Sequence, residues 1–147
     1  RALFERALAT YGQVRAPVFA ALEAPDADLT ALRRHFSQAI GFFASHPATP
    51  ACLATRTVFE ADEELRQLAA KLMVRMRRGF LNCLAGAARA GQVRPDVDLE
   101  GAASCLELLW HGVGAGMSGG GSEAQIRRAV DAALDGWATA GGSDGGQ

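Results

Sequence analysis

The segment that most constrains the fold covers residues 99–117, because it predicts a helix that is apolar on two sides. At roughly 100° per residue, one face is apolar and consists of Leu99, Ala102, Ala103, Leu106, Leu109, Trp110, Val113 and Met117. A second face holds small or apolar residues, which are Gly101, Cys105, Leu108, Gly112 and Gly116. Only a single file of polar residues separates the two faces, made of Glu100, Ser104, Glu107 and His111. A helix of this kind has to be covered on more than one side.

The last predicted helix, residues 122–139, shows the same doubled pattern and favours a homodimer. Two terminal helices of a 147-residue domain cannot both be central, so we expect each to pack one face on the domain core and the other on a second copy. The predicted interface consists of Gly101, Cys105, Leu108, Gly112, Gly116, Ala129, Ala132 and Gly136. The alternative is an ordinary core helix whose glycines merely weaken it.

Helical spacing of apolar residues continues through the rest of the chain, which is therefore predicted to be all-α with about six helices. The earlier helices are expected at residues 2–22, 29–45, 50–59 and 62–90. Pro17 lies inside the first of them and should kink or split it, because proline lacks an N–H and its ring clashes with the preceding turn. The N-caps are expected at Asp28, Thr49, Asp62, Asp98 and Ser122, and a left-handed C-cap at Gly91.

Composition and charge argue against several classes of protein. The formal net charge of −1 provides no basic excess for binding nucleic acid. Cys52, Cys83 and Cys105 form no C-x-x-C motif, so neither a disulfide framework nor a zinc site is expected, and no metal or cofactor is predicted. Apolar runs fall short of the roughly 18–20 residues of a membrane span, and we expect no membrane partner and a cytoplasmic location.

Three segments of the sequence carry a family likeness. They are ALFERAL at residues 2–8, a stretch from 50 to 113 with the motif G-x-V-R-x-D-x-D at 91–98, and SEAQIRRAVDAALDGWA at 122–138. Together they resemble the C-terminal ligand-binding and dimerisation domain of tetracycline-repressor-like transcriptional regulators. The likeness covers residues 1–139, which we expect to form one domain, followed by a flexible tail at 140–147.

The resemblance implies a transcriptional regulator whose C-terminal domain binds a small apolar or aromatic effector. In this family the last two helices pair with those of a second copy as an intersubunit four-helix bundle, and the effector moves the helix that follows the DNA-binding domain. Gly12 and Pro17 lie in the matching helix and would serve as its bend; a kink without a signalling role is the alternative. The chain opens on Arg1 without the family's helix-turn-helix, so we interpret it as a fragment that does not bind operator DNA by itself. Most members of this family are repressors that leave the DNA when their ligand binds, so the resemblance implies the same behaviour here.

An effector pocket is expected among the helices at 29–45, 50–59 and 62–90, with the helix at 99–117 closing one side. Its candidate lining residues are large, soft or apolar side chains, namely Phe36, Phe43, Phe59, Met73, Met76, Phe80, Cys83 and Trp110. The polar candidates for anchoring a ligand are Arg56, Asn82, Glu107 and His111. For the apolar side chains the alternative is an ordinary core. For Glu107 and His111 it is a solvated strip beside the dimer interface.

The sequence contains no catalytic arrangement that would indicate an enzyme. It has no nucleophile elbow, no phosphate loop and no helical H-E-x-x-H motif. Cys52 and Cys83 would sense electrophiles only if a neighbouring cation favoured their thiolate forms; buried cysteines acting as small apolar residues are the alternative. His35 and His46 are expected near helix surfaces.

The alternative function is a helical dimerisation or adaptor module that binds a protein partner and has no small-molecule effector. The three possible classes of protein predict different interiors. An effector domain should enclose an apolar cavity with one or two polar groups, and an adaptor should have a solid core. An enzyme should have an open cleft in which titratable groups converge.

Overall fold

The computed structural model describes residues 2–49, 52–60 and 62–140, and within these ranges the chain is all-helical. The helices are α1 (Ala2–Val14), α2 (Ala16–Glu23), α3 (Leu29–Ser45), α4 (Leu53–Thr57), α5 (Glu63–Arg89), α6 (Leu99–Ser118) and α7 (Glu123–Trp137). This confirms the all-α prediction. The tail predicted at 140–147 lies outside the described residues from 141 onward. None of the described helices is long and apolar enough to cross a membrane.

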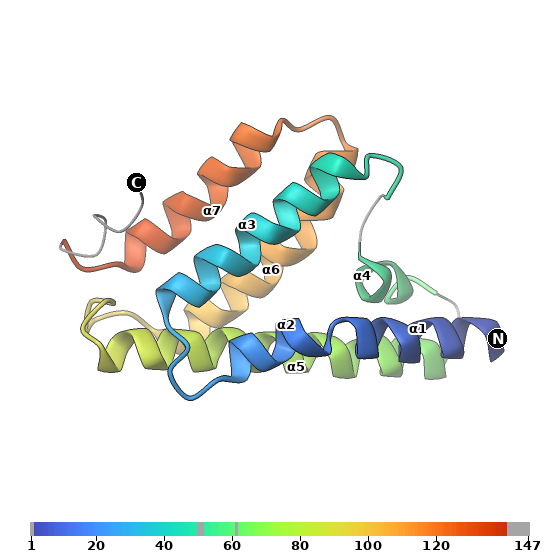
Figure 1. Cartoon of the computed structure of the whole chain (residues 1–147), viewed down its shortest axis with the longest axis horizontal. Coiled ribbons are helices and arrows are strands. Elements are labelled where there is room, and N and C mark those ends of the chain that lie inside the picture. Colours follow the sequence, from blue (N-terminus) through green and yellow to red (C-terminus); the bar gives the residue numbers. More distant parts are fainter. Residues whose placement is uncertain (1, 50–51, 61, 141–147) are drawn as a thin grey trace.

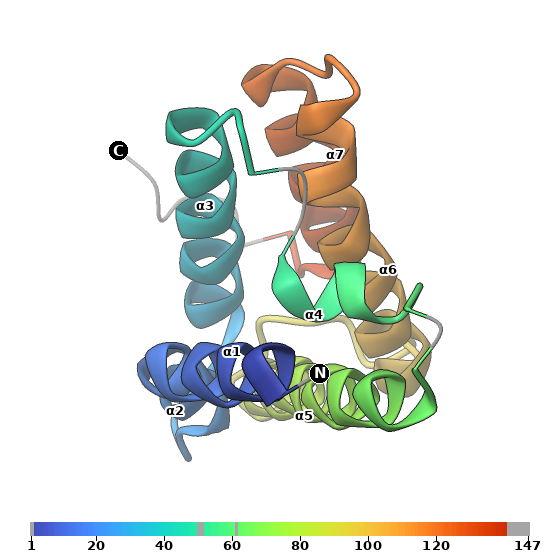
Figure 2. The ribbon, with the colours of Figure 1, turned by 90° about the vertical axis from the view of Figure 1, so that its right-hand side faces the viewer.

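The helices form two groups that meet at a steep angle (Figure 1). The long helix α5 is the base, and α1 and α2 run along it in contact with it. Helices α3, α6 and α7 pack against one another and rise from that base (Figure 2). The short helix α4 lies in the angle between the two groups and contacts both α1 and α5.

Pro17 divides the predicted first helix in two. Helix α1 ends at Val14 and α2 begins at Ala16, so the proline lies in the first turn of α2, where its missing N–H leaves no hydrogen bond unmade. The described residues therefore contain seven helices where about six were predicted. Arg15 lies at the junction of α1 and α2.

Most helix starts coincide with the predicted caps. The side chains of Asp28, Asp62 and Ser122 each accept a hydrogen bond from the backbone of the first helical turn, at 2.9, 3.0 and 3.1 Å. Asp98 occupies its predicted N-cap position, but its side chain makes no capping hydrogen bond. Gly91, with a φ of +71°, adopts the left-handed conformation predicted for the end of α5.

The prediction for the short helix is wrong in its bounds and in its cap. Helix α4 covers only Leu53–Thr57 in place of residues 50–59, and Pro50 lies outside the described residues. Its N-cap is Cys52, whose sulfur accepts a hydrogen bond from the Thr55 N–H at 3.3 Å, and not Thr49. A cysteine cap has no strong sequence signal, because Ser, Thr, Asp and Asn are the usual N-cap residues.

The hydrophobic core lies where α3, α5 and α6 meet. Phe36 of α3 stacks on Phe80 of α5 with ring centroids 5.5 Å apart, and Leu106 of α6 is fully buried in the same cluster. Helices α2 and α7 add Leu22 and Leu134 to this cluster. The core therefore connects the base to the rising helices and leaves the far side of α3 and α6, toward α1 and α4, for the cavity described below.

The loop between α2 and α3 is fixed directly on α5. A Cβ atom at Gly86 would lie 2.0 Å from the carbonyl oxygen of Ala27, so only glycine permits this approach. One turn earlier, Asn82 donates hydrogen bonds to the carbonyl oxygens of Leu22 and Ala24, both at 2.9 Å. Asn82, a candidate ligand anchor, is thus bonded to the end of α2.

Candidate functional site

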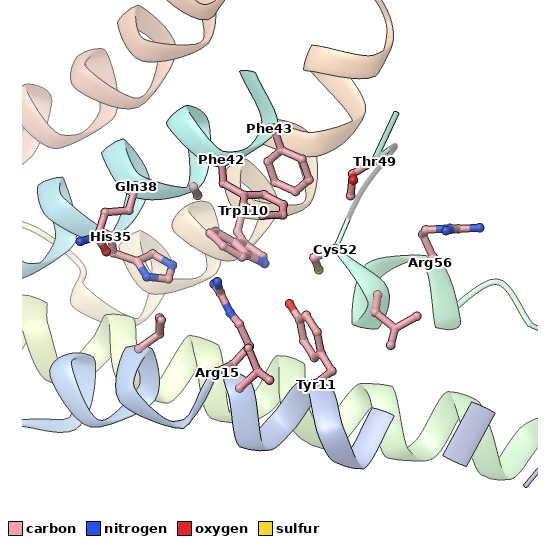
Figure 3. A pocket seen from close by; sticks show the side chains of 14 residues that line it. Tyr11, Arg15, His35, Gln38, Phe42, Phe43, Thr49, Cys52, Arg56 and Trp110 are labelled. Atoms are coloured by element: carbon pink, nitrogen blue, oxygen red, sulfur yellow. The ribbon is translucent and has the colours of Figure 1, made fainter. Parts of the chain in front are cut away.

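A cavity of about 530 Å³ lies between α1, α2, α3 and α4, and Trp110 of α6 completes its wall (Figure 3). Its lining consists of Tyr11, Val14, Arg15, Val18, His35, Gln38, Ala39, Phe42, Phe43, Thr49, Cys52, Leu53, Arg56 and Trp110. These residues are mostly apolar or aromatic. None of these lining residues is an acid, whereas Arg15 and Arg56 are cations. The site is an apolar chamber with positive charge on its wall.

The chamber has a buried interior and an exposed edge. Ala39, Phe43 and Trp110 are buried, at 7%, 6% and 5% exposure. At the edge formed by α1 and α3, Val14 is 69% exposed and Phe42 is 50% exposed. A ligand of suitable size would therefore enter between α1 and α3 and reach the buried aromatic rings beyond.

Arg15 extends from the α1–α2 junction into the cavity toward Trp110 (Figure 3). Its guanidinium carbon lies 5.5 Å from the centre of the Trp110 ring and 6.0 Å from the centre of the Tyr11 ring, within the range of a cation–π interaction. The Nε atom of Arg15 is buried and has no hydrogen-bond partner among the described residues. The guanidinium is held by stacking and is free to donate hydrogen bonds to a ligand.

His35 also faces the cavity, and the prediction that it lies near a helix surface is wrong, because it is only 5% exposed. His35 lies on the face of α3 that borders the cavity. Ala39 and Phe43, which also line the cavity, follow it on the same face after four and eight residues. Its ring centroid lies 4.6 Å from that of Trp110, and its buried Nε2 atom has no partner among the described residues. Burial lowers the pKa of His35 to about 3, helped by the positive charge of Arg15, so the imidazole is neutral at neutral pH.

A chain of polar side chains leads from the other end of the cavity to α6. Tyr11 is half-buried beside Cys52; desolvation of its hydroxyl, and then the interaction with Cys52, raises the pKa of Tyr11. The Cys52 sulfur lies 2.9 Å from Thr55 Oγ1, which lies 3.0 Å from Nδ1 of His111. Nε2 of His111 is in turn 4.0 Å from a carboxylate oxygen of Glu107. Side chains of α1, α4 and α6 are therefore linked at this end.

The predicted pocket residues occupy several different places. The cavity is lined by Phe43, Arg56 and Trp110. Buried core positions outside the lining are taken by Phe36, Met73, Met76, Phe80 and Cys83. Phe59 is 85% exposed, and His111 lies behind the lining, bonded to Thr55. Glu107 pairs with Arg77 of α5 at 3.4 Å as well as with His111.

Sequence reasoning missed the side chains that come from the first helices and from the inner edge of α3. Tyr11, Arg15 and Val18 follow one another at spacings of four and three, so they share one face of the first segment. That spacing places them on one face, but it does not show that the face borders a cavity. No residue of α5 is among the described lining residues, although α5 was expected to bound the pocket; α2, α4 and α6 cover it.

The predicted dimer residues lie on a second surface, along α6 and α7. A hollow of about 300 Å³ between these helices is lined by Cys105, Leu108, Leu109, Gly112, Val113, Ile126, Ala129 and Val130. Leu108 is 72% exposed, and a Cβ atom at Gly112 or Gly136 would meet nothing within 4 Å. A Cβ atom at Gly116 would lie 2.8 Å from Ile126, so this glycine makes room within the chain.

Gly101 and Ala132, the two other positions of the predicted interface, differ in their surroundings. A Cβ atom at Gly101 would lie 2.5 Å from a carboxylate oxygen of Asp98, so Gly101 also makes room within the chain. Ala132 is exposed on α7. The free apolar surface of the single chain is therefore centred on Leu108 and Gly112.

Fold and cavity together define an all-helical domain with a largely apolar ligand-sized pocket. Residues 29–138, three quarters of the chain, match the family described as Tetracyclin repressor-like, C-terminal domain. The chain belongs to this family of regulator domains, which confirms the resemblance in the sequence. No curated protein and no solved structure matched the chain significantly.

Proposed function

We propose that this chain is the effector-binding and homodimerisation domain of a cytoplasmic transcriptional regulator, with a small and largely apolar molecule as the effector. Membership of the tetracycline-repressor-like family supports a regulator that dimerises and binds a small molecule. The observation that carries the proposal is the cavity of about 530 Å³ with apolar and aromatic walls. Pockets for small ligands are typically concave and mostly apolar, with a few polar groups that orient the ligand.

The cavity also argues against the alternative function, an adaptor without an effector. An adaptor predicts a solid core, because its binding surface lies outside. Here Phe36 and Phe80 pack against each other in the core, but a chamber lies beside them, shares Trp110 and Phe43 with the core and reaches solvent at Val14 and Phe42. A ligand-binding function therefore explains the cavity, and an adaptor function does not.

Homodimerisation is proposed through α6 and α7. Leu108 and Gly112 lie on a face of α6 that no other described helix of the chain covers. In the family the matching helices form a four-helix bundle with a second copy, and small residues such as Gly112 and Ala129 would let the helices approach closely. We propose the same bundle here.

Helix α1 is the proposed output of the pocket. Tyr11 and Val14 of α1 and Arg15 beside it line one wall, and His35 and Phe42 of α3 line the opposite wall. A ligand between these walls would change the position of α1 on α5. In the intact regulator, the helix-turn-helix would precede α1, so this movement would change its position on operator DNA. We therefore propose that the intact protein is a repressor that leaves its operator DNA when the ligand binds.

A thermal-shift screen with aromatic and fatty small molecules tests the ligand site. A ligand that binds only the folded chain at 100 times its Kd adds about 2.7 kcal/mol to the free energy of unfolding, which raises Tm by several degrees. Val18→Phe adds a ring to the cavity wall and should remove the shift. Val74→Phe makes the same change on α5, where Val74 is 37% exposed and outside the lining, and should keep the shift.

Two results would contradict the proposed pocket. One is a screen in which no compound raises the Tm of the wild-type chain. The other is a ligand whose shift is lost in Val74→Phe and retained in Val18→Phe, because that ligand would bind outside the cavity.

A further inference from the structure

Two buried nitrogen atoms in the cavity wall have no hydrogen-bond partner among the described residues, Nε of Arg15 and Nε2 of His35. His35 is only 5% exposed, so its ring is largely shielded from bulk solvent. A buried polar group without a partner costs free energy, and native structures contain few of them. Both atoms belong to cavity-lining residues, and both side chains reach Trp110, with the His35 ring 4.6 Å and the Arg15 guanidinium carbon 5.5 Å from the centre of the Trp110 ring (Figure 3). The pair is therefore arranged for a partner that enters with a ligand.

The charge of this end of the cavity indicates the chemistry of that partner. Arg15 is a full positive charge, and no acidic residue lines the described wall to neutralise it. No ion pair of Arg15 occurs among the described residues, whereas Arg33, Arg75, Arg94 and Arg127 all pair with carboxylates. An unpaired guanidinium inside an apolar chamber favours an anion with two acceptor oxygens.

We propose that the inner end of the cavity is a carboxylate site, in which Arg15 and His35 bind the head of an apolar acid. This inference rests on the proposed function and specifies the ligand class of that same site. The Arg15 guanidinium donates to the carboxylate, and neutral His35 donates from Nε2 in the tautomer that carries its proton there. The apolar remainder of the acid, an alkyl chain or an aromatic ring, lies among Val18, Leu53 and Phe43.

The stacking of Arg15 supports this assignment. The guanidinium lies over the Trp110 ring at 5.5 Å, which fixes the fork of donors before a ligand arrives. Less conformational freedom is then lost on binding than with a mobile surface arginine. Arg56, the other cation of the lining, is exposed on α4 and has no such contact among the described residues.

Calorimetric titration of the wild-type chain with matched ligands tests the site. The ligands are decanoate and decan-1-ol, and 2-naphthoate and 2-naphthol, at pH 7.5, with decylamine as the cationic member. Each pair shares a tail and differs in its head. A charged hydrogen bond in a buried site predicts that at least one acid binds about 10- to 100-fold more tightly than its alcohol, with decylamine the weakest of the decyl series.

Variants assign the effect to residues. Arg15→Met keeps an unbranched apolar stem and removes the guanidinium and its charge, so it should weaken binding of the acid by about 10- to 100-fold and that of the alcohol by less than about 3-fold. Arg15→Lys should retain part of the preference for the acid. The control Arg56→Met removes the exposed cation of the same lining and should leave the preference unchanged.

The outcomes separate this inference from the proposed function. If acids and alcohols bind equally well, the carboxylate site is overturned and the apolar effector pocket stands. If the acid preference disappears in Arg56→Met and persists in Arg15→Met, the site is assigned to the wrong residue and the inference fails. If none of the ligands binds to the wild-type chain, both the inference and the proposed pocket fail. The comparison of acids with alcohols uses the wild-type chain, so it does not depend on whether any variant folds.

Discussion

At the scale of single residues, the chemistry of the cavity depends on side chains that carry charge or can gain it. Arg15 and His35 lie in the wall with buried nitrogen atoms unpaired, next to the Trp110 ring. A histidine in such a place is neutral, because burial and a neighbouring cation both oppose its protonation. The same residue in the unfolded chain titrates near its ordinary value. Stability should therefore depend on pH through His35.

His35 is predicted to destabilise the fold as pH decreases from about 6.5 to about 3. The pKa of His35 is lowered from 6.5 to about 3 in the folded chain, so between these values the unfolded chain binds a proton that the folded chain does not. The contribution to stability is complete above 6.5 and is lost as pH falls. It amounts to about 2 kcal/mol between pH 7 and pH 5. Denaturant unfolding at both pH values measures it.

The control variants for this prediction are His35→Phe and His46→Gln. The first removes the titrating ring and keeps an aromatic side chain beside Trp110, so the loss of stability between pH 7 and pH 5 should shrink by about 2 kcal/mol. His46 is exposed, and its replacement should leave the loss unchanged. An equal pH dependence in the wild-type chain and in His35→Phe would contradict the buried, neutral histidine.

Sequence patterns could not identify these residues as members of the site. Periodicity marks apolar faces, and it selected Phe36, Met76 and Phe80, which are large and apolar because they form the core. Arg15 and His35 interrupt such patterns, so they read as surface positions. Arg15 enters the cavity because it lies at the junction of α1 and α2, on the face that also carries Tyr11 and Val18.

At the scale of helices, capping residues and prolines predict where a helix begins and ends better than they predict which other helices it packs on. The caps at Asp28, Asp62 and Ser122 and the proline break follow from interactions within a few residues, and they occur where predicted. Helix α4 departs from this pattern, because Cys52 caps it. Which helices cover α5 depends on packing between distant segments, so this could not be derived from local signals.

Helix α6 carries the prediction about assembly. The wild-type chain should sediment at about twice its monomer mass of 15.4 kDa. Gly112→Arg should give a folded monomer, because a side chain at this position meets nothing within 4 Å in the single chain but would enter the proposed interface. Arginine also has a higher helix propensity than glycine, so the monomer should not lose stability. Sedimentation velocity and thermal unfolding measure the two effects.

Ala20→Arg is the matched control for Gly112→Arg. It introduces the same charge at an exposed position of α2, a helix that packs on α5, α3 and α1, and the dimer should persist. A wild-type chain that is monomeric at tens of micromolar, or a Gly112→Arg dimer as stable as the wild type, would contradict the interface.

At the scale of the whole molecule, the sequence predicted the fold and the presence of a pocket, but it did not predict where in the fold the pocket lies. Its all-α class and its family were predicted from helix spacing and from three segments of the chain. The pocket was expected against α5, but α5 is covered by α2, α4 and α6, and the cavity lies between α1 and α3. This site depends on the angle at which α3 and α6 rise from the base, and no local pattern records that angle (Figure 2).

The central claim, that a small apolar ligand binds in the cavity beside α1, is tested most directly by the fluorescence of Trp110. The chain has two tryptophans, so Trp137→Phe leaves Trp110 of the cavity wall as the single reporter, and Trp110→Phe leaves Trp137 at the end of α7. Both variants are titrated with decanoate and with decan-1-ol. The account predicts a saturable change in Trp110 emission with at least one ligand, and no change in Trp137 emission. An unchanged Trp110 signal with both ligands, or a saturable change in the Trp137 signal alone, would contradict it.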